Sequence, residues 1–171
     1  MDFLGAFAGA PSTVALIVKY VRESQQDPAV RLFAETLIQN ISSKDYLSEI
    51  LALYNGVLKY TRYASDPRTV ELVKRPEWIV KQIAAGRVPS IDCDEISGLL
   101  AALALSLGRE ARLVTVAFNN SFHANERQYS HIYVQVREPR SATWITLDPV
   151  AAEDTSTMLG RIKALKIWPI A

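Results

Sequence analysis

Residues 92–107 read DCDEISGLLAALALSL and decide the fold. Asp94 and Glu95 lie in the first turn of the predicted helix, where the helix dipole favours carboxylates. Beyond Gly98 the stretch is apolar on almost every side, which is typical of a helix that is buried all round. Gly108 follows it, and glycine is the common residue after a helix end. The stretch therefore predicts a central, buried helix with a polar beginning.

The chain before this stretch has the pattern of helices. Apolar residues recur at helical spacing over 14–21 and 29–41. A capping box over 42–45 is expected to open a third helix, and Pro76 to open a short one that ends near Gly86. The first half of the chain is therefore predicted to be helical.

The chain after Gly108 changes character. Residues 112–118, 132–136 and 143–147 are rich in β-branched and aromatic residues, which favours strands. The loop 138–141 separates the last two strands and predicts a hairpin. Helices followed by an antiparallel sheet give an α+β fold.

Composition narrows the function classes. The chain has 171 residues, which fit a single domain, and 19 Lys and Arg against 18 Asp and Glu give a net charge of +1. That balance does not favour nucleic acid or an anionic membrane as a partner. Asp2 stands where a signal peptide would carry a basic residue, and no apolar run reaches membrane-spanning length, so a cytoplasmic protein is expected. With one cysteine and two histidines, neither an internal disulfide nor a structural zinc site is expected.

Cys93 is the candidate nucleophile. It lies at the start of the predicted helix after the N-cap candidate Asp92, where unpaired N–H groups and the helix dipole favour a thiolate. Asp94 and Glu95 oppose ionisation by repulsion between like charges. A nearby cation would therefore have to dominate.

His131 can supply that cation. If Arg137 pairs with Ala142 across the hairpin loop, His131 lies directly opposite Asp148. A carboxylate at that distance can hold one ring nitrogen of the imidazole while the other faces a nucleophile. With Cys93, this gives a nucleophile, a base and an orienting acid in one arrangement.

The segment from about Tyr60 to Val150 resembles the transglutaminase-like superfamily, whose core has a papain-like fold. The pieces that match are RYASDP (62–67), RPEWI (75–79), DCDEISGLLAALALSLGREARLV (92–114), SHIYVQV (130–136) and LDPV (147–150). The resemblance implies Cys93 as nucleophile, His131 as base and Asp148 as orienting acid. The chain departs from the family where Ile91 replaces the usual glycine before Asp-Cys.

The resemblance implies cysteine-dependent acyl transfer on peptide or amide bonds, through a thioester. Hydrolysis is expected rather than transamidation, because nothing in the sequence excludes water. The Cys93 N–H is one natural oxyanion donor, with Tyr60, Tyr63 or Trp78 as a second. Trp144, which the same hairpin register places opposite Gln135, is a candidate to wall the groove. No cofactor or metal is implied.

One domain over 1–171 is expected, with a helical extension over 1–45 and a catalytic core over 46–171. Its expected partner is a protein or peptide substrate. His123, in a polar run, is a rival base. The fold could instead serve as a non-catalytic peptide-binding or assembly module. The apolar residues 3–7 suggest that the N-terminal helices dock on a partner protein.

Overall fold

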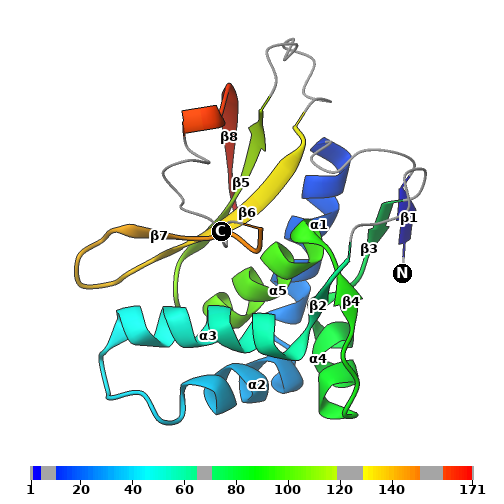
Figure 1. Ribbon diagram of the computed structural model, residues 1–171. Coiled ribbons are helices and arrows are strands. Elements are labelled where there is room, and N and C mark those ends of the chain that lie inside the picture. The colour runs from blue at the N-terminus through cyan, green and yellow to red at the C-terminus, as the bar shows by residue number, and fades with distance from the viewer. Residues whose placement is uncertain (1, 5–10, 65–70, 119–128, 151–159, 171) are drawn as a thin grey trace.

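The computed structural model describes residues 2–4, 11–64, 71–118, 129–150 and 160–170. Figure 1 shows the helices gathered on one side of a four-stranded sheet, with α5 between them. The helices are α1 (Pro11–Ser24), α2 (Pro28–Ile38), α3 (Tyr46–Tyr60), α4 (Pro76–Ala84) and α5 (Cys93–Ser106). The strands are β1 (Asp2–Leu4), β2 (Arg62–Tyr63), β3 (Glu71–Val73), β4 (Ser90–Ile91), β5 (Ala111–Ala117), β6 (His131–Arg137), β7 (Trp144–Leu147) and β8 (Ala164–Pro169). The predicted α+β class is confirmed.

Helix α5 is the centre of the molecule. Every residue in it except Leu105 is buried, because helices α1 to α4 surround it on one side and β6 packs on the other. Helix α1 comes especially close at Gly98, where an added Cβ would lie 3.2 Å from Cγ2 of Ile17. One cluster of buried apolar side chains runs from Val14 in α1 to Leu147 in β7. The N-terminal helix and the predicted catalytic core therefore share one hydrophobic core.

The main sheet is antiparallel, with strand order β7-β6-β5-β8. Leu113, Ile132 and Val134 lie on the face that joins the large core around α5. Val114 and Tyr133 belong to a smaller cluster on the opposite face. Strand β8 was not predicted, since its residues alternate only between half-buried and exposed and therefore carry a weak apolar pattern.

Two short strand pairs complete the backbone near the start of α5. β1 pairs with β3 in an antiparallel ladder, so the N-terminal segment is hydrogen-bonded to its own chain. β2 and β4 are parallel, with Tyr63 opposite Ile91. Strand β4 leads directly into α5, so this pairing fixes the approach of the chain to that helix.

The helix ends agree with the sequence except that α2 ends at Ile38 instead of residue 41, and except at the start of α3. The carboxylate of Asp45 accepts a hydrogen bond from the Ser48 N–H at 3.2 Å and caps this helix. The predicted capping box over 42–45 is therefore wrong, because the cap is the last residue of that segment. Gly86 and Gly108 follow α4 and α5 with φ values of 74° and 73°, a left-handed conformation that favours glycine.

The β6–β7 hairpin is two residues out of the predicted register. Arg137 lies opposite Trp144, where the sequence pattern placed Ala142. The paired ladder ends before it reaches His131. The prediction that His131 lies directly opposite Asp148 in the ladder is therefore wrong.

The turn of this hairpin explains the shift. The Glu138 N–H donates to the Thr143 carbonyl at 2.8 Å, so the strands continue one residue further than predicted. The Glu138 carboxylate accepts hydrogen bonds from the N–H groups of Arg140 and Ser141. Ala142, with φ of 56°, completes the turn. Side-chain hydrogen bonds of this kind, which apolar alternation does not reveal, set the register here.

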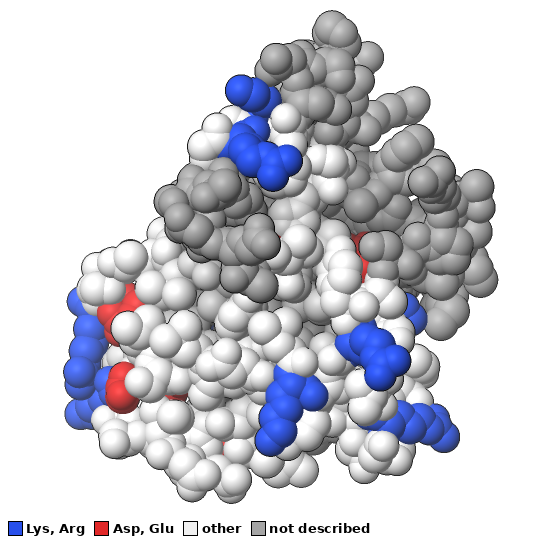
Figure 2. Space-filling model, viewed as in Figure 1, with Lys and Arg blue, Asp and Glu red and all other residues white. Residues whose placement is uncertain are grey.

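Figure 2 shows the surface of the same face as Figure 1. Lys and Arg side chains stand at separate places on it, with a broad uncharged area between them. Within the described residues, this face therefore shows no continuous basic patch. No described helix is long and apolar enough to cross a bilayer.

Candidate active site

Cys93 is the first residue of α5 and is 7% exposed. Asp92 caps the helix by accepting a hydrogen bond from the Asp94 N–H at 3.2 Å. Glu95 completes a capping box, since it accepts the Asp92 N–H at 3.2 Å. The thiol also lies beside the N–H of Ile132 on β6. The cysteine is therefore held where the helix start meets the start of a strand.

The environment of the thiol favours its protonated form. Burial raises the pKa of Cys93 above its ordinary value, and the negative charges of Asp92, Asp94 and Asp148 raise it further. The Ile132 N–H lowers it, but by less. The thiolate bias expected from the helix N-terminus alone is thus outweighed by desolvation and by three carboxylates.

His131 and Asp148 form a buried pair. The Nε2 atom of His131 lies 2.9 Å and 2.8 Å from the two carboxylate oxygens of Asp148. Because a carboxylate accepts hydrogen bonds, Nε2 carries the hydrogen, and Nδ1 is the basic atom of the neutral ring. The contact expected from the sequence is present, although strand pairing does not create it.

Asp148 is itself held from two directions. Its carboxylate accepts the Val150 N–H at 2.9 Å, which closes a turn just after β7. Its carbonyl accepts the Tyr54 hydroxyl of α3 at 2.6 Å. The sequence pattern did not single out Tyr54, because nothing in a helical stripe shows that one hydroxyl reaches a loop 94 residues away.

The Ile132 peptide connects the two halves of the site. Its N–H faces the Cys93 sulfur, and its carbonyl lies 3.3 Å from the Ser97 hydroxyl on α5. Among the described residues, no hydrogen bond joins the Cys93 thiol to the His131 ring. Catalytic hydrogen bonds in ligand-free sites are often long and tighten when substrate binds. The structure thus places Cys93, the candidate nucleophile, beside Ile132, the residue that follows the candidate base His131.

The aromatic candidates lie on different elements. Tyr60, at the end of α3, packs edge-on against Phe33 with ring centroids 5.9 Å apart. Tyr63 on β2 and Trp78 on α4 are 46% and 41% exposed. No described hydrogen bond or ring contact joins Tyr60 or Trp78 to Cys93, His131 or Asp148. A second oxyanion donor among Tyr60, Tyr63 and Trp78 stays a prediction.

The predicted position of Trp144 is wrong, whereas the prediction for His123 is not tested. Trp144 lies opposite Arg137 rather than Gln135, and the Arg112 guanidinium stacks on its ring at 4.0 Å. Trp144 therefore lies on the same sheet face as His131 but further along the strands. His123, the rival base, lies outside the described residues.

Three carboxylates gather at the helix start. Oxygens of Asp92, Asp94 and Glu95 lie within 4.8 Å of one another. Two of these groups already accept hydrogen bonds from the main chain, since Asp92 binds the Asp94 N–H and Glu95 binds the Asp92 N–H. We therefore assign Asp92 and Glu95 to helix capping.

Comparison with known proteins supports the predicted family. A model of the transglutaminase-like superfamily matches residues 33–149. Comparison with curated proteins found no match. A "putative protease" from Parabacteroides distasonis superposes with a TM-score of 0.59 at 14% identity, covering 81% of this chain and 26% of that one. A "putative cysteine protease" from Cytophaga hutchinsonii superposes with a TM-score of 0.53 at 15% identity, covering 94% and 55%.

The chain thus spans about a quarter and about half of the length of these two proteins. At such low identity the superpositions show a shared fold. The family match covers more than half of the chain and includes Cys93, His131 and Asp148. The chain therefore belongs to the transglutaminase-like superfamily.

Proposed function

We propose that this chain is a cysteine-dependent acyl-transfer enzyme that hydrolyses peptide or amide bonds in a protein or peptide substrate. One observation carries the proposal: the buried His131 ring is fixed through Nε2 by Asp148, next to the peptide that faces the Cys93 sulfur. Family membership and the two solved structures described as proteases support the same chemistry.

In the proposed reaction the Cys93 sulfur attacks the carbonyl carbon of the scissile amide. The thiol proton moves to Nδ1 of His131 as the carbon–sulfur bond forms. His131 then gives this proton to the leaving amine, the carbon–nitrogen bond breaks and a thioester remains. Water, deprotonated by His131, attacks the thioester and releases the acid, and the proton returns to the sulfur. Asp148 stabilises the imidazolium in both steps.

The raised pKa of the Cys93 thiol favours one order of these events. A thiol that is protonated at rest must lose its proton during attack, rather than wait as a preformed thiolate. His131 is then a general base in the attacking step. The Cys93 N–H, in the first turn of α5, is our candidate for one oxyanion donor, because such groups have no partner within the helix.

Acylation of Cys93 by p-nitrophenyl acetate, followed by intact-protein mass spectrometry, tests the proposal. Because the chain has one cysteine, the acetyl adduct is unambiguous when Cys93→Ser serves as the control. We expect the wild type to form and then lose the adduct, and His131→Ala to acylate about 100-fold more slowly. Equal rates in wild type and His131→Ala would overturn the proposed role of His131.

A non-catalytic peptide-binding module is the second candidate. The observation that favours it is the burial of Cys93 among three carboxylates, which suppresses the nucleophilic thiolate. A binding module predicts that wild-type Cys93 resists acylation by p-nitrophenyl acetate as strongly as Cys93 in His131→Ala does, while the cysteine of both proteins is alkylated by iodoacetamide after unfolding.

Adding a primary amine to the acylation assay separates hydrolysis from transamidation, since transamidation yields the N-substituted acetamide.

A further inference from the structure

A buried ion pair between Lys74 and Glu95 holds the first turn of α5 from a neighbouring segment of the chain. Oε1 of Glu95 accepts a hydrogen bond from Lys74 Nζ at 2.6 Å and a second from the Lys74 N–H at 3.0 Å. The side chains of Lys74 and Glu95 are 13% and 0% exposed. The proposed mechanism uses neither residue.

Glu95 joins this contact to the residue before the nucleophile. Its second oxygen, Oε2, accepts the Asp92 N–H at 3.2 Å. One buried carboxylate thus holds Lys74 on one side and the N-cap of α5 on the other. Cys93 lies between Asp92 and Glu95, so a movement of Glu95 would displace the sulfur with it.

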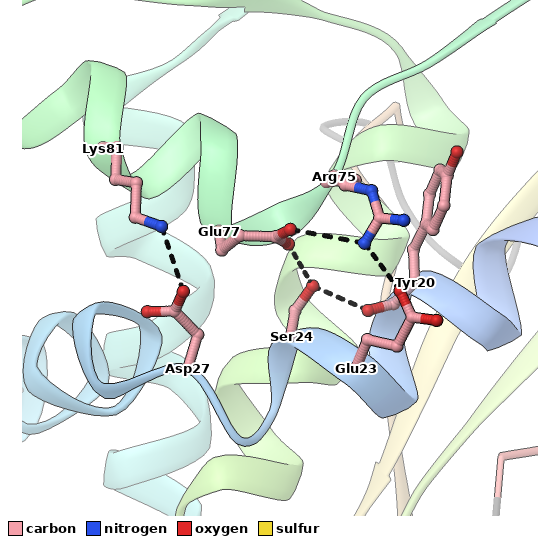
Figure 3. Close-up of polar contacts among 7 residues, drawn as sticks. All are labelled: Tyr20, Glu23, Ser24, Asp27, Arg75, Glu77 and Lys81. Atoms are coloured by element: carbon pink, nitrogen blue, oxygen red, sulfur yellow. Dashed lines mark hydrogen bonds and ion pairs between the residues drawn. The ribbon is translucent and has the colours of Figure 1, made fainter. Parts of the chain in front are cut away.

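Lys74 lies in a segment that is itself well anchored, between β3 and α4. Figure 3 shows its neighbour Arg75 stacked on the Tyr20 ring of α1, with the guanidinium 4.2 Å from the ring centroid. The same guanidinium reaches Glu23 at 2.6 Å and Glu77 at 3.5 Å. Helix α1 lies wholly outside residues 33–149, which the family model matches.

We propose that Lys74 and Glu95 are positioning residues for the acyl transfer proposed above. They form a brace that holds the first turn of α5, and with it Cys93, against the anchored junction of β3 and α4. This proposal rests on the proposed function for its effect on rate. Its structural part, the fixing of residues 92–95, does not depend on that function.

The charges around Glu95 give the brace a pH dependence. Burial raises the pKa of Glu95 to about 7, while the Lys74 charge lowers it and the Asp92 charge raises it. Asp94 and the Cys93 thiol are the other titratable groups of this turn. As the pH falls through about 7, Glu95 takes up a proton and its attraction to Lys74 weakens.

Hydrogen exchange and Cys93 acylation test the brace in the full chain. The variants are Lys74→Met, which removes the ammonium but keeps the apolar stem, and Glu95→Gln, which keeps the volume. Lys81→Met is the matched control, because Lys81 makes an ion pair with Asp27 at 3.0 Å that does not involve α5 (Figure 3). Melting curves confirm that each variant is folded at the assay temperature.

We expect the amides of residues 92–96 to exchange about tenfold faster in Lys74→Met and in Glu95→Gln, and unchanged in Lys81→Met. Acylation of Cys93 by p-nitrophenyl acetate should slow about fivefold or more in the same two variants. The acylation rate of the wild type should drop as the pH falls through about 7, because the brace weakens there. Glu95→Gln should lack this drop, and Lys81→Met should keep it.

Exchange within twofold of wild type in both variants would overturn the brace. So would faster exchange with an unaltered acylation rate and pH profile, since the contact would then be structural alone. The proposed function fails by a different result, equal acylation of wild type and His131→Ala. In that case the exchange measurement still decides whether Lys74 and Glu95 fix the first turn.

Discussion

The start of α5 and the start of β6 each bury a candidate catalytic side chain, but different forces hold them. Cys93 lies in a turn closed by neighbours in sequence, where Asp92 accepts the Asp94 N–H and Glu95 accepts the Asp92 N–H. His131 is fixed by Asp148, 17 residues away across a hairpin. The cysteine side (residues 92–95) is therefore determined mainly by local hydrogen bonds. The histidine side (His131 and Asp148) is determined by tertiary structure.

The two sides also differ in charge. Burial and the charges of Asp92 and Asp94 raise the pKa of the Cys93 thiol, and Asp148 adds to this from the histidine side; among the described residues, Asp148 is the carboxylate paired with the His131 ring. Under the proposed function, the helix start controls the ionisation of the thiol and the start of β6 supplies the base. Changes on the two sides should have separable effects.

Asp148→Asn should have the largest effect, because it breaks the histidine side. The amide oxygen can still accept the Val150 N–H, so the turn should survive, but the charge that stabilises the imidazolium is lost. We expect Cys93 acylation to slow by about 10²- to 10⁴-fold while the melting temperature changes little. The p-nitrophenyl acetate assay measures this. A rate within threefold of wild type would contradict the role of Asp148.

Ile17→Ala tests the packing behind the cysteine side. Ile17 is 2% exposed and contacts α5 at Gly98, so its truncation should leave a cavity against the central helix. We expect the free energy of unfolding to fall by about 2–5 kcal/mol, measured by urea denaturation. Leu32→Ala, at a position that is 64% exposed on α2, is the control and should change it little. Equal effects would mean that α1 is not part of the core.

The charge of Glu95 should make stability depend on pH. Its pKa is about 7 in the folded protein and near 4.5 when unfolded, so the folded state binds the proton more tightly. The contribution is fully present below about pH 4.5 and is lost as the pH rises through about 7, amounting to about 3 kcal/mol at most. Urea denaturation from pH 4.5 to 8 of wild type and Glu95→Gln checks this. The same decline in both proteins would contradict the assignment.

Tyr54→Phe should have the smallest effect, and it tests how Asp148 is held beside His131. It removes the hydroxyl that donates to the Asp148 carbonyl at 2.6 Å and keeps the ring. We expect a loss of about 1 kcal/mol in the free energy of unfolding and a few-fold slower acylation of Cys93. A wild-type acylation rate with reduced stability would show that Tyr54 supports the fold but not the position of Asp148.

Much of the fold could be predicted because its signals are local. Asp92 as the cap of α5 and Gly108 beyond its end are found where the sequence placed them. The hairpin register was missed because the Glu138 carboxylate closes the turn through main-chain N–H groups, which leave no trace in apolar alternation. Strand β8 was missed because its residues are only partly buried.

By itself, the sequence determined the class of the fold, the buried helix that begins at Cys93 and the candidate residues His131 and Asp148. Short-range capping and apolar periodicity suffice for the fold class and the helix, since both act within a few residues. His131 and Asp148 were singled out by the family resemblance and by a hairpin register that is two residues off. Only the tertiary structure decided which groups set the thiol's pKa and that Lys74 supports Glu95. Desolvation and charge interactions depend on distances between elements far apart in the chain, and only folding fixes those distances.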